Sequence, residues 1–186
     1  FTDNEWNEES TQLAFISSSR DHKEANFRVA DAATGEVRSV HREVVATQYE
    51  SGRDDVCWRF LPKSNEFIWY SQKDNWGHLY LHDLKTGKLK NQVTKGNFVV
   101  TSIVRVDEKN RVIYFKAQGR EANNNPYYVH FYRVNFDGNN LKCLTAEVGD
   151  HTINLSPDGG YFTDTYSQPN VAPVTVLRDV NGKLVS

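Results

Sequence analysis

The feature that most constrains this chain is a short, strand-like segment that occurs four times. Its copies are Leu13–Ile16, Phe67–Tyr70, Val112–Phe115 and Tyr161–Asp164, and a polar turn precedes each copy. Short runs rich in Val, Ile, Tyr, Phe, Trp and Thr predict β-strands, and the chain has almost no helical periodicity. The sequence therefore predicts a repeated all-β unit.

A second hairpin follows each of these segments and sets the length of the repeat. The turns contain Gly35, Gly87, Gly138 and Gly182, which supply the positive φ that tight hairpins need. The residues expected to return to the core after these turns lie 52, 52 and 43 residues apart, and they are Val37, Leu89, Leu141 and Leu184. Four strands in about 40 to 50 residues is the period of a β-propeller blade.

We therefore predict an all-β fold in which four antiparallel, four-stranded blades form part of a β-propeller within a single domain, 1–186. The blades are expected at about residues 1–50, 51–97, 98–149 and 150–186. A β-sandwich is the alternative all-β fold. A sandwich, however, does not repeat the same order of strands and turns four times.

Composition narrows the classes of partner. The net charge is -2 and the sequence contains no basic block, which argues against nucleic acid. No apolar run reaches the roughly 18 to 20 residues of a membrane span. The chain has no methionine, so we expect Phe1 to lie inside a longer protein.

Few residues form a pattern that suggests catalysis, metal binding or disulfide formation. Cys57 and Cys143 are either two separate buried thiols or a disulfide between blades. His78 and His82 are four residues apart in a predicted strand, where about 13 Å separates them, so a shared metal ion is not expected. No G-x-S-x-G nucleophile motif is present. We predict no catalytic residue, no metal ion and no cofactor in this chain.

Two charged groups have alternative interpretations. Arg53, Asp54, Asp55 and Arg59 form the densest charge cluster, and they are either salt-bridged loop residues or residues that face a ligand. Glu8–Glu9 lies in the turn position common to all four units. A solvated turn is the preferred interpretation of this acidic pair.

Several segments resemble the propeller domain of the dipeptidyl peptidase IV family, within the prolyl oligopeptidase group of serine peptidases. They are Asn75–Leu81, Leu84–Gly87, Val93–Phe98, Leu155–Gly159, Asp164–Ser167 and Pro173–Val174. Their order and spacing match over most of the chain, most firmly from about Val56 onward. A single element such as Ser156–Gly159 occurs in many propellers, whereas the whole series is much more specific.

The resemblance implies a parent enzyme in which an eight-bladed propeller, half of it formed by this chain, caps an α/β-hydrolase domain. Such enzymes remove dipeptides from free N-termini, and the Ser-Asp-His triad would lie C-terminal to Ser186. Arg59–Phe60 resembles an Arg-Phe step whose ring helps line the substrate pocket in some members. Leu61 stands where those members have a second arginine. The alternative role of Phe60 is a core residue of an inner strand.

The expected function is thus the substrate-gating and scaffold portion of an exported, periplasmic serine exopeptidase. Its expected partners are peptide substrates, its own hydrolase domain and a second copy of the chain, paired through end faces near Phe15 and Phe162. No nucleic acid and no membrane span are expected. The alternative function is a non-enzymatic, TolB-like periplasmic propeller that binds a protein partner.

Overall fold

The computed structural model describes residues 4–51, 57–122 and 124–186. In these ranges the chain forms fifteen β-strands and one 3₁₀ helix, η1 (Pro62–Ser64), and no α-helix. The strands form four separate antiparallel sheets, each built from consecutive strands. The predicted all-β blade architecture is confirmed.

Each sheet is a meander, and we number the sheets as blades in chain order. Blade 1 consists of β1 (Asn4–Trp6), β2 (Gln12–Ser18), β3 (Glu24–Asp31) and β4 (Val37–Val44). Blade 2 consists of β5 (Arg59–Leu61), β6 (Glu66–Ser71), β7 (His78–Asp83) and β8 (Leu89–Gln92). Blade 3 consists of β9 (Val99–Asp107), β10 (Val112–Gln118), β11 (Val129–Asn135) and β12 (Lys142–Cys143). Blade 4 consists of β13 (Asp150–Leu155), β14 (Tyr161–Gln168) and β15 (Val171–Asp179).

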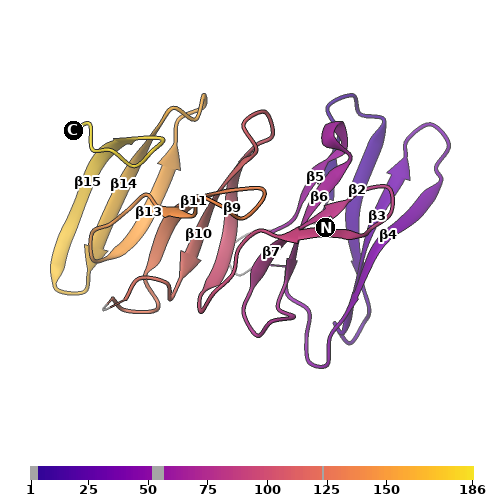
Figure 1. Ribbon diagram of the computed structural model, residues 1–186, viewed down its shortest axis with the longest axis horizontal. Helices are drawn as coiled ribbons and strands as arrows, with labels where there is room; N and C mark the ends of the chain where they lie inside the picture. The colour runs from indigo at the N-terminus through magenta and orange to yellow at the C-terminus, as the bar shows by residue number, and fades with distance from the viewer. Residues whose placement is uncertain (1–3, 52–56, 123) are drawn as a thin grey trace.

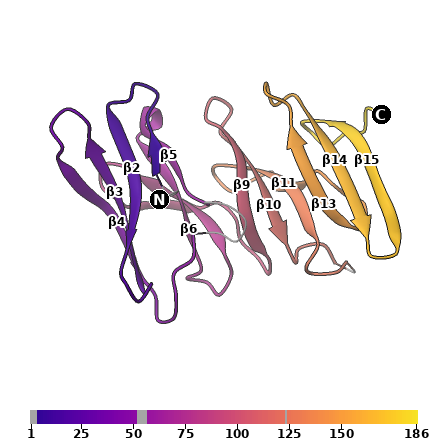
Figure 2. The ribbon, with the colours of Figure 1, turned by 180° about the vertical axis from the view of Figure 1, so that it is seen from behind.

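The four blades stand side by side in chain order along the longest axis of the molecule, with blade 1 at one end and blade 4 at the other (Figures 1 and 2). They form an open row in which neighbouring sheets face each other. Closure into a ring of eight blades stays a prediction.

The apolar core lies between the blades. Alternate residues of a strand point to opposite faces of its sheet, so Phe67 and Trp69 of β6 pack toward blade 1, whereas Ile68 and Tyr70 pack toward blade 3. A third cluster, which includes Phe131 and Phe162, joins blades 3 and 4. Because both faces are covered, β6 is buried along its whole length.

The hairpin that ends each blade also packs on the preceding blade. Gly87, in the β7–β8 turn, has a φ of +70°, and a Cβ atom on it would lie 2.0 Å from the carbonyl oxygen of Val40 in β4. Gly35 holds the same place in blade 1 with a φ of +72°, yet nothing lies within 4 Å of its Cβ position. The turn glycines therefore serve the turn itself and, where a blade precedes, the contact between blades.

One hydrogen bond recurs at all three blade interfaces. A side chain near the outer strand of each blade donates to a backbone carbonyl in or beside the last turn of the next blade. These bonds join Arg38 Nη1 to Leu84 O at 3.0 Å, Asn91 Nδ2 to Phe136 O at 2.8 Å, and Lys142 Nζ to Asn181 O at 2.8 Å. The same type of polar contact is therefore repeated between each pair of neighbouring blades, near their outer strands.

The residues expected to return to the core after these turns do not do so. Val37, Leu89 and Leu184 are 48%, 49% and 56% exposed, and Leu141 is only partly buried. They lie on or beside the outermost segment of each blade, and no further strand pairs with that segment in the described residues. The 52-residue spacing identified the repeat correctly, but the burial assigned to these positions was wrong.

Blade 4 departs from the predicted four strands. The segment after Gly182 turns back along β15 and pairs with it through a single bridge, Arg178 with Leu184. Val185 N also donates to Leu177 O at 2.8 Å. In the described residues this segment is an edge pairing rather than a fourth strand.

Candidate functional site

Arg59 lies on β5, the first strand of blade 2, and its side chain is directed to blade 3. Its Nη1 donates to Trp58 O at 2.8 Å and its Nη2 donates to Ile103 O at 2.7 Å. Ile103 lies beside a shift in the register of β9 with β10. The bond to Ile103 O ties blade 2 to blade 3, whereas the bond to Trp58 O stays within the chain segment that carries Arg59.

Phe60 faces the other neighbour. Its side chain is 4% exposed and belongs to the apolar cluster between blades 1 and 2. Its backbone N–H donates to Glu5 Oε2 of β1 at 2.8 Å, while burial raises the pKa of Glu5. The sequence thus places Arg59 and Phe60 on a first strand that is tied to both neighbouring blades. Their role in a substrate pocket stays a prediction.

The other members of the predicted charge cluster, Arg53, Asp54 and Asp55, lie outside the described residues. Glu8, by contrast, is an exposed turn residue that pairs with Lys63 at 2.5 Å across blades 1 and 2. The preferred interpretation of Glu8–Glu9 as a solvated turn is confirmed for this part of the chain.

The histidines of β7 have separate partners. His78 Nδ1 lies 3.1 Å from Thr94 Oγ1, and His82 Nδ1 lies 3.0 Å from Gly87 O. A similar contact recurs in blade 3, where His130 Nδ1 lies 2.9 Å from Thr145 O. Within the described part of the chain, no group of three or more His, Cys, Asp or Glu side chains comes together as a metal site.

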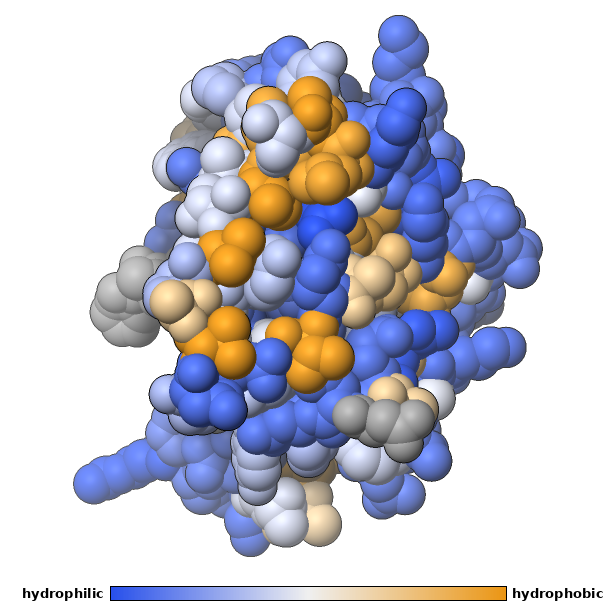
Figure 3. Space-filling model, turned by 90° about the vertical axis from the view of Figure 1, so that its left-hand side faces the viewer, coloured by the Kyte–Doolittle hydropathy of each residue, from blue (hydrophilic) through white to orange (hydrophobic). Residues whose placement is uncertain are grey.

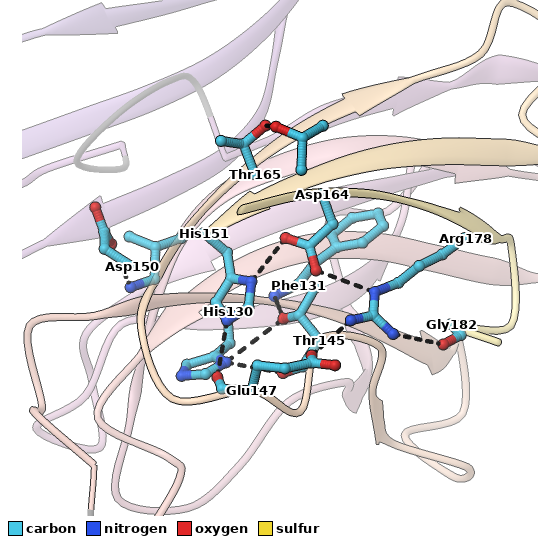
Figure 4. Close-up of polar contacts among 12 residues, drawn as sticks. His130, Phe131, Thr145, Glu147, Asp150, His151, Asp164, Thr165, Arg178 and Gly182 are labelled. Atoms are coloured by element: carbon cyan, nitrogen blue, oxygen red, sulfur yellow. Dashed lines mark hydrogen bonds and ion pairs between the residues drawn. The ribbon is translucent and has the colours of Figure 1, made fainter. Parts of the chain in front are cut away.

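A cluster of titratable side chains lies in blade 4, three of them buried and one, Glu147, partly exposed (Figure 4). We call it the blade 4 charge cluster, and it consists of Glu147, His151, Asp164 and Arg178. His151 Nδ1 lies 2.7 Å from Asp164 Oδ1, and Arg178 Nε donates to Asp164 Oδ2 at 3.0 Å. Arg178 also forms an ion pair with Glu147 Oε2 at 2.6 Å. The side chains of His151 and Asp164 are fully buried.

The strands of blade 4 bring this cluster together. Asp164 is in the middle strand β14, and it receives His151 from β13 and Arg178 from β15. In the strand register His151 is opposite Tyr166 and Arg178 is opposite Phe162, so both side chains reach Asp164 along a diagonal. The His151 ring also lies 4.7 Å from the His130 ring of blade 3. The cluster therefore joins the strands of blade 4 and contacts blade 3.

The contact between His151 and Asp164 has the form of a catalytic Asp–His pair, but the surroundings do not suit general base catalysis. The second ring nitrogen, Nε2, lies 2.9 Å from Glu147 O. A general base needs that nitrogen free to face a nucleophile. The pair therefore serves packing and orientation.

Sequence reasoning missed this cluster, although a signal was present. Asp164 faces the preceding blade, as do Trp69 in blade 2 and Phe115 in blade 3. A carboxylate at a position that is aromatic in the other repeats is expected to be buried and paired. Comparison of the repeats in the correct register would have identified Asp164 as a buried carboxylate, but not its partners His151 and Arg178.

Neither cysteine forms a disulfide; Cys57 is buried and Cys143 is partly buried. The predicted option of a disulfide between blades is wrong. Cys57 packs in the core between blades 2 and 3, and Cys143 Sγ donates to Thr145 O at 3.0 Å. Burial raises the pKa of the Cys143 thiol, which favours its unreactive form.

Comparison with known proteins gives consistent matches. A family model for the dipeptidyl peptidase IV N-terminal region matches residues 1–173. A dipeptidyl peptidase 4 from Arthroderma otae is 33% identical over 122 residues, which cover 63% of this chain and 15% of the relative. A crystal structure of a protein assigned as a dipeptidyl aminopeptidase IV from Bacteroides ovatus has a TM-score of 0.78 at 26% identity, over 99% of this chain and 28% of that chain.

The dipeptidyl peptidase 4 of Porphyromonas gingivalis has the same fold, with a TM-score of 0.77 at 19% identity over 94% of this chain and 24% of that chain. This chain therefore spans between 15% and 28% of the length of the proteins compared. None of these matches supports the TolB-like alternative. The match over residues 1–173 shows that the chain belongs to the dipeptidyl peptidase IV N-terminal region family.

Proposed function

We propose that this chain is part of the propeller of a serine exopeptidase that removes dipeptides from the N-termini of peptides. In this role the blades form a scaffold and gate, which admits peptides and excludes folded proteins. The observation that carries the proposal is the family match over residues 1–173. The stacked blades with apolar cores at their interfaces support it, because they form a rigid wall.

The proposal includes a hydrolase domain outside this chain, which supplies the catalytic triad, and peptides as the substrate class. It also includes export to the periplasm, closure into an eight-bladed ring and the blade limits predicted from the sequence. In the described residues, no helix has the length and apolar character to span a membrane.

The substrate-binding role of Arg59 and Phe60 is the least supported part of the proposal. The location of both on the first strand of blade 2 supports it, since first strands lie nearest the channel of a closed propeller. The burial of the Phe60 ring in the core argues for a packing role instead. Phe60 therefore requires a test that separates stability from kinetics.

The proposal is tested with the coding sequence downstream of Ser186 and with two proteins made from that gene. We expect a serine-hydrolase elbow downstream and turnover of a Gly-Pro chromogenic substrate by the full-length product. The 186-residue chain alone should give no turnover, because it lacks the G-x-S-x-G motif.

A serine-to-alanine variant at the elbow is the matched control and should be inactive. Absence of an elbow downstream would refute the peptidase role. Turnover by the 186-residue chain that survives repurification and is abolished by a serine-directed inhibitor would refute the placement of the triad.

A further inference from the structure

Blades 1 and 2 form a cleft of about 710 Å³ between the end of β4, the segment that follows it and the β6–β7 turn. This volume is in the range of small-molecule sites, roughly 300 to 1,000 Å³. The lining includes four neutral hydrogen-bonding side chains, Thr47, Gln48, Gln72 and Asn75. It also includes one acidic residue, Glu43, and a lysine, Lys73, whose charges define what the cleft can bind.

The carboxylate of Glu43 is fixed in position but not neutralised. It accepts hydrogen bonds from Trp69 Nε1 at 2.5 Å and from Ser71 Oγ at 2.6 Å. Both donors are neutral, and no ion pair among the described residues involves Glu43. A carboxylate has further lone pairs after two such bonds. Glu43 is therefore prepared to accept an ammonium group.

Lys73 supplies a positive charge on the same cleft. Its Nζ lies 3.7 Å from the centroid of the Tyr80 ring, and in the described part of the chain it forms no ion pair. Tyr80 is directly opposite Trp69 in the β6–β7 register. Glu43 thus contacts one ring of this aromatic pair and Lys73 covers the other.

The other two titratable residues of the lining, His41 and Arg42, add no unpaired charge to the cleft. Burial, the nearby His82 ring and Lys73 lower the pKa of His41 to about 4, so the His41 ring is neutral at pH 7. It packs against Trp69 with ring centroids 5.2 Å apart. Arg42 is already paired with Glu24 at 2.5 Å. The cleft therefore offers one available anion and one available cation, which lie against the neighbouring rings of Trp69 and Tyr80.

We propose that this cleft binds a short peptide with free ends, whose ammonium group contacts Glu43 and whose carboxylate contacts Lys73. The neutral amides and hydroxyl of the lining suit the peptide groups between these two ends. Both charges come from blades 1 and 2, so binding can be measured on this chain without a catalytic domain.

The test measures binding to the 186-residue chain by calorimetry and by tryptophan fluorescence, because Trp69 forms part of the site. The probe is alanyl-alanine, compared with its N-acetylated form and its C-terminal amide. We expect saturable binding of alanyl-alanine, and a loss of roughly ten- to a hundredfold in affinity for each capped form, as for a lost charged hydrogen bond.

Two variants assign the contacts. Glu43→Gln should remove the discrimination against the acetylated probe, and Lys73→Gln should remove the discrimination against the amide. Glu36→Gln and Lys95→Gln are matched controls at exposed positions outside the cleft and should bind like the wild type. Near-ultraviolet circular dichroism verifies the fold, and exposed Lys73 gives a second test should Glu43→Gln unfold.

Three results would overturn the proposal. The first is equal affinity for the capped and the free probes, and the second is wild-type affinity in both cleft variants. The third is no binding of alanyl-alanine at concentrations up to about 10 mM, since weaker binding is not specific. Because the assay involves no turnover, its failure would leave the proposed peptidase role untouched. Failure of the peptidase assay would equally leave the binding result intact.

Discussion

Gly35 and Gly87 occupy the same turn in neighbouring blades. Substitution of each by alanine therefore separates the cost of a positive φ from the cost of a close contact between blades. Both have positive φ, but only the Cβ position of Gly87 meets backbone, at 2.0 Å from Val40 O. Gly35→Ala should therefore cost about 1 kcal/mol from φ strain alone. Gly87→Ala should cost about 1 to 3 kcal/mol more, since the blades must move apart. Urea unfolding of both variants measures the difference, and equal costs would contradict the packing role.

Phe60 is the residue at which packing and function compete. Its ring is buried with Phe27 and Phe67, so Phe60→Ala should cost about 3 to 5 kcal/mol in unfolding free energy. In the full-length enzyme a pocket role would also lower kcat/KM, with Phe60→Leu as the milder control. A large drop in Tm with normal kinetics in the folded fraction would reject the pocket role.

Glu66 is a buried acid that pairs with two cations, Lys90 and Arg111. Burial alone would raise its pKa, but hydrogen bonds from Arg111 and Lys90 lower the pKa from 4.5 to about 2. Because the pKa of Glu66 is lower in the folded than in the unfolded chain, the ionised carboxylate stabilises the fold at pH values above the unfolded pKa. This contribution to the unfolding free energy is lost as the pH falls from about 4.5 toward 2.

Glu66→Gln should therefore lose about 1 to 3 kcal/mol near neutral pH, and its stability should depend less on pH over the acidic range. Unfolding of wild type and variant in urea at several pH values measures this, with exposed Glu36→Gln as the matched control. Parallel pH profiles for wild type and Glu66→Gln would contradict the assignment.

At the scale of the element, the sequence predicted where strands lie better than which face each residue occupies. The four repeated segments all fall in second strands, β2, β6, β10 and β14. Phe162, however, was expected on an exposed end face and is 1% exposed against blade 3. A shift of one residue in the comparison of repeats exchanges the two faces of a strand. Phe15 was placed correctly, since Ala14 beside it faces the core.

The sequence could not predict which residues come together in the blade 4 charge cluster or in the cleft between blades 1 and 2. Their members come from different strands and loops, and only the register of β13, β14 and β15 places His151 and Arg178 on Asp164. The family resemblance identified the fold, but it contained no information about these contacts.

The blade 4 charge cluster gives a prediction for a buried ion pair. Arg178→Met leaves the buried Asp164 carboxylate with His151 alone, so it should cost about 3 to 5 kcal/mol. Arg42→Met, which breaks the surface pair with Glu24, should cost about 0 to 1 kcal/mol. The double variant Asp164→Leu with Arg178→Met should recover much of the loss. Equal effects of Arg42→Met and Arg178→Met would show that the cluster contributes no more than a surface pair.

At the scale of the whole molecule, the apolar core lies between blades. Each inner blade is covered on both faces, whereas blades 1 and 4 have a neighbour on one face only. Figure 3 views the free end of the row at blade 4 and shows apolar side chains gathered in patches there. The large apolar residues exposed on this blade are Tyr161, Val171, Val174, Leu184 and Val185.

We predict that the 186-residue chain associates with a second copy through its end faces, because exposed apolar patches drive such burial. Light scattering should show a mass that rises with concentration. Val174→Lys on blade 4 should shift the molecule toward monomer, since a lysine in the contact would be desolvated. Leu89→Lys is the matched control, because Leu89 is 49% exposed at the rim, where a free edge needs no partner. A strict monomer at high concentration, without apolar surface that binds dye, would refute end-to-end pairing.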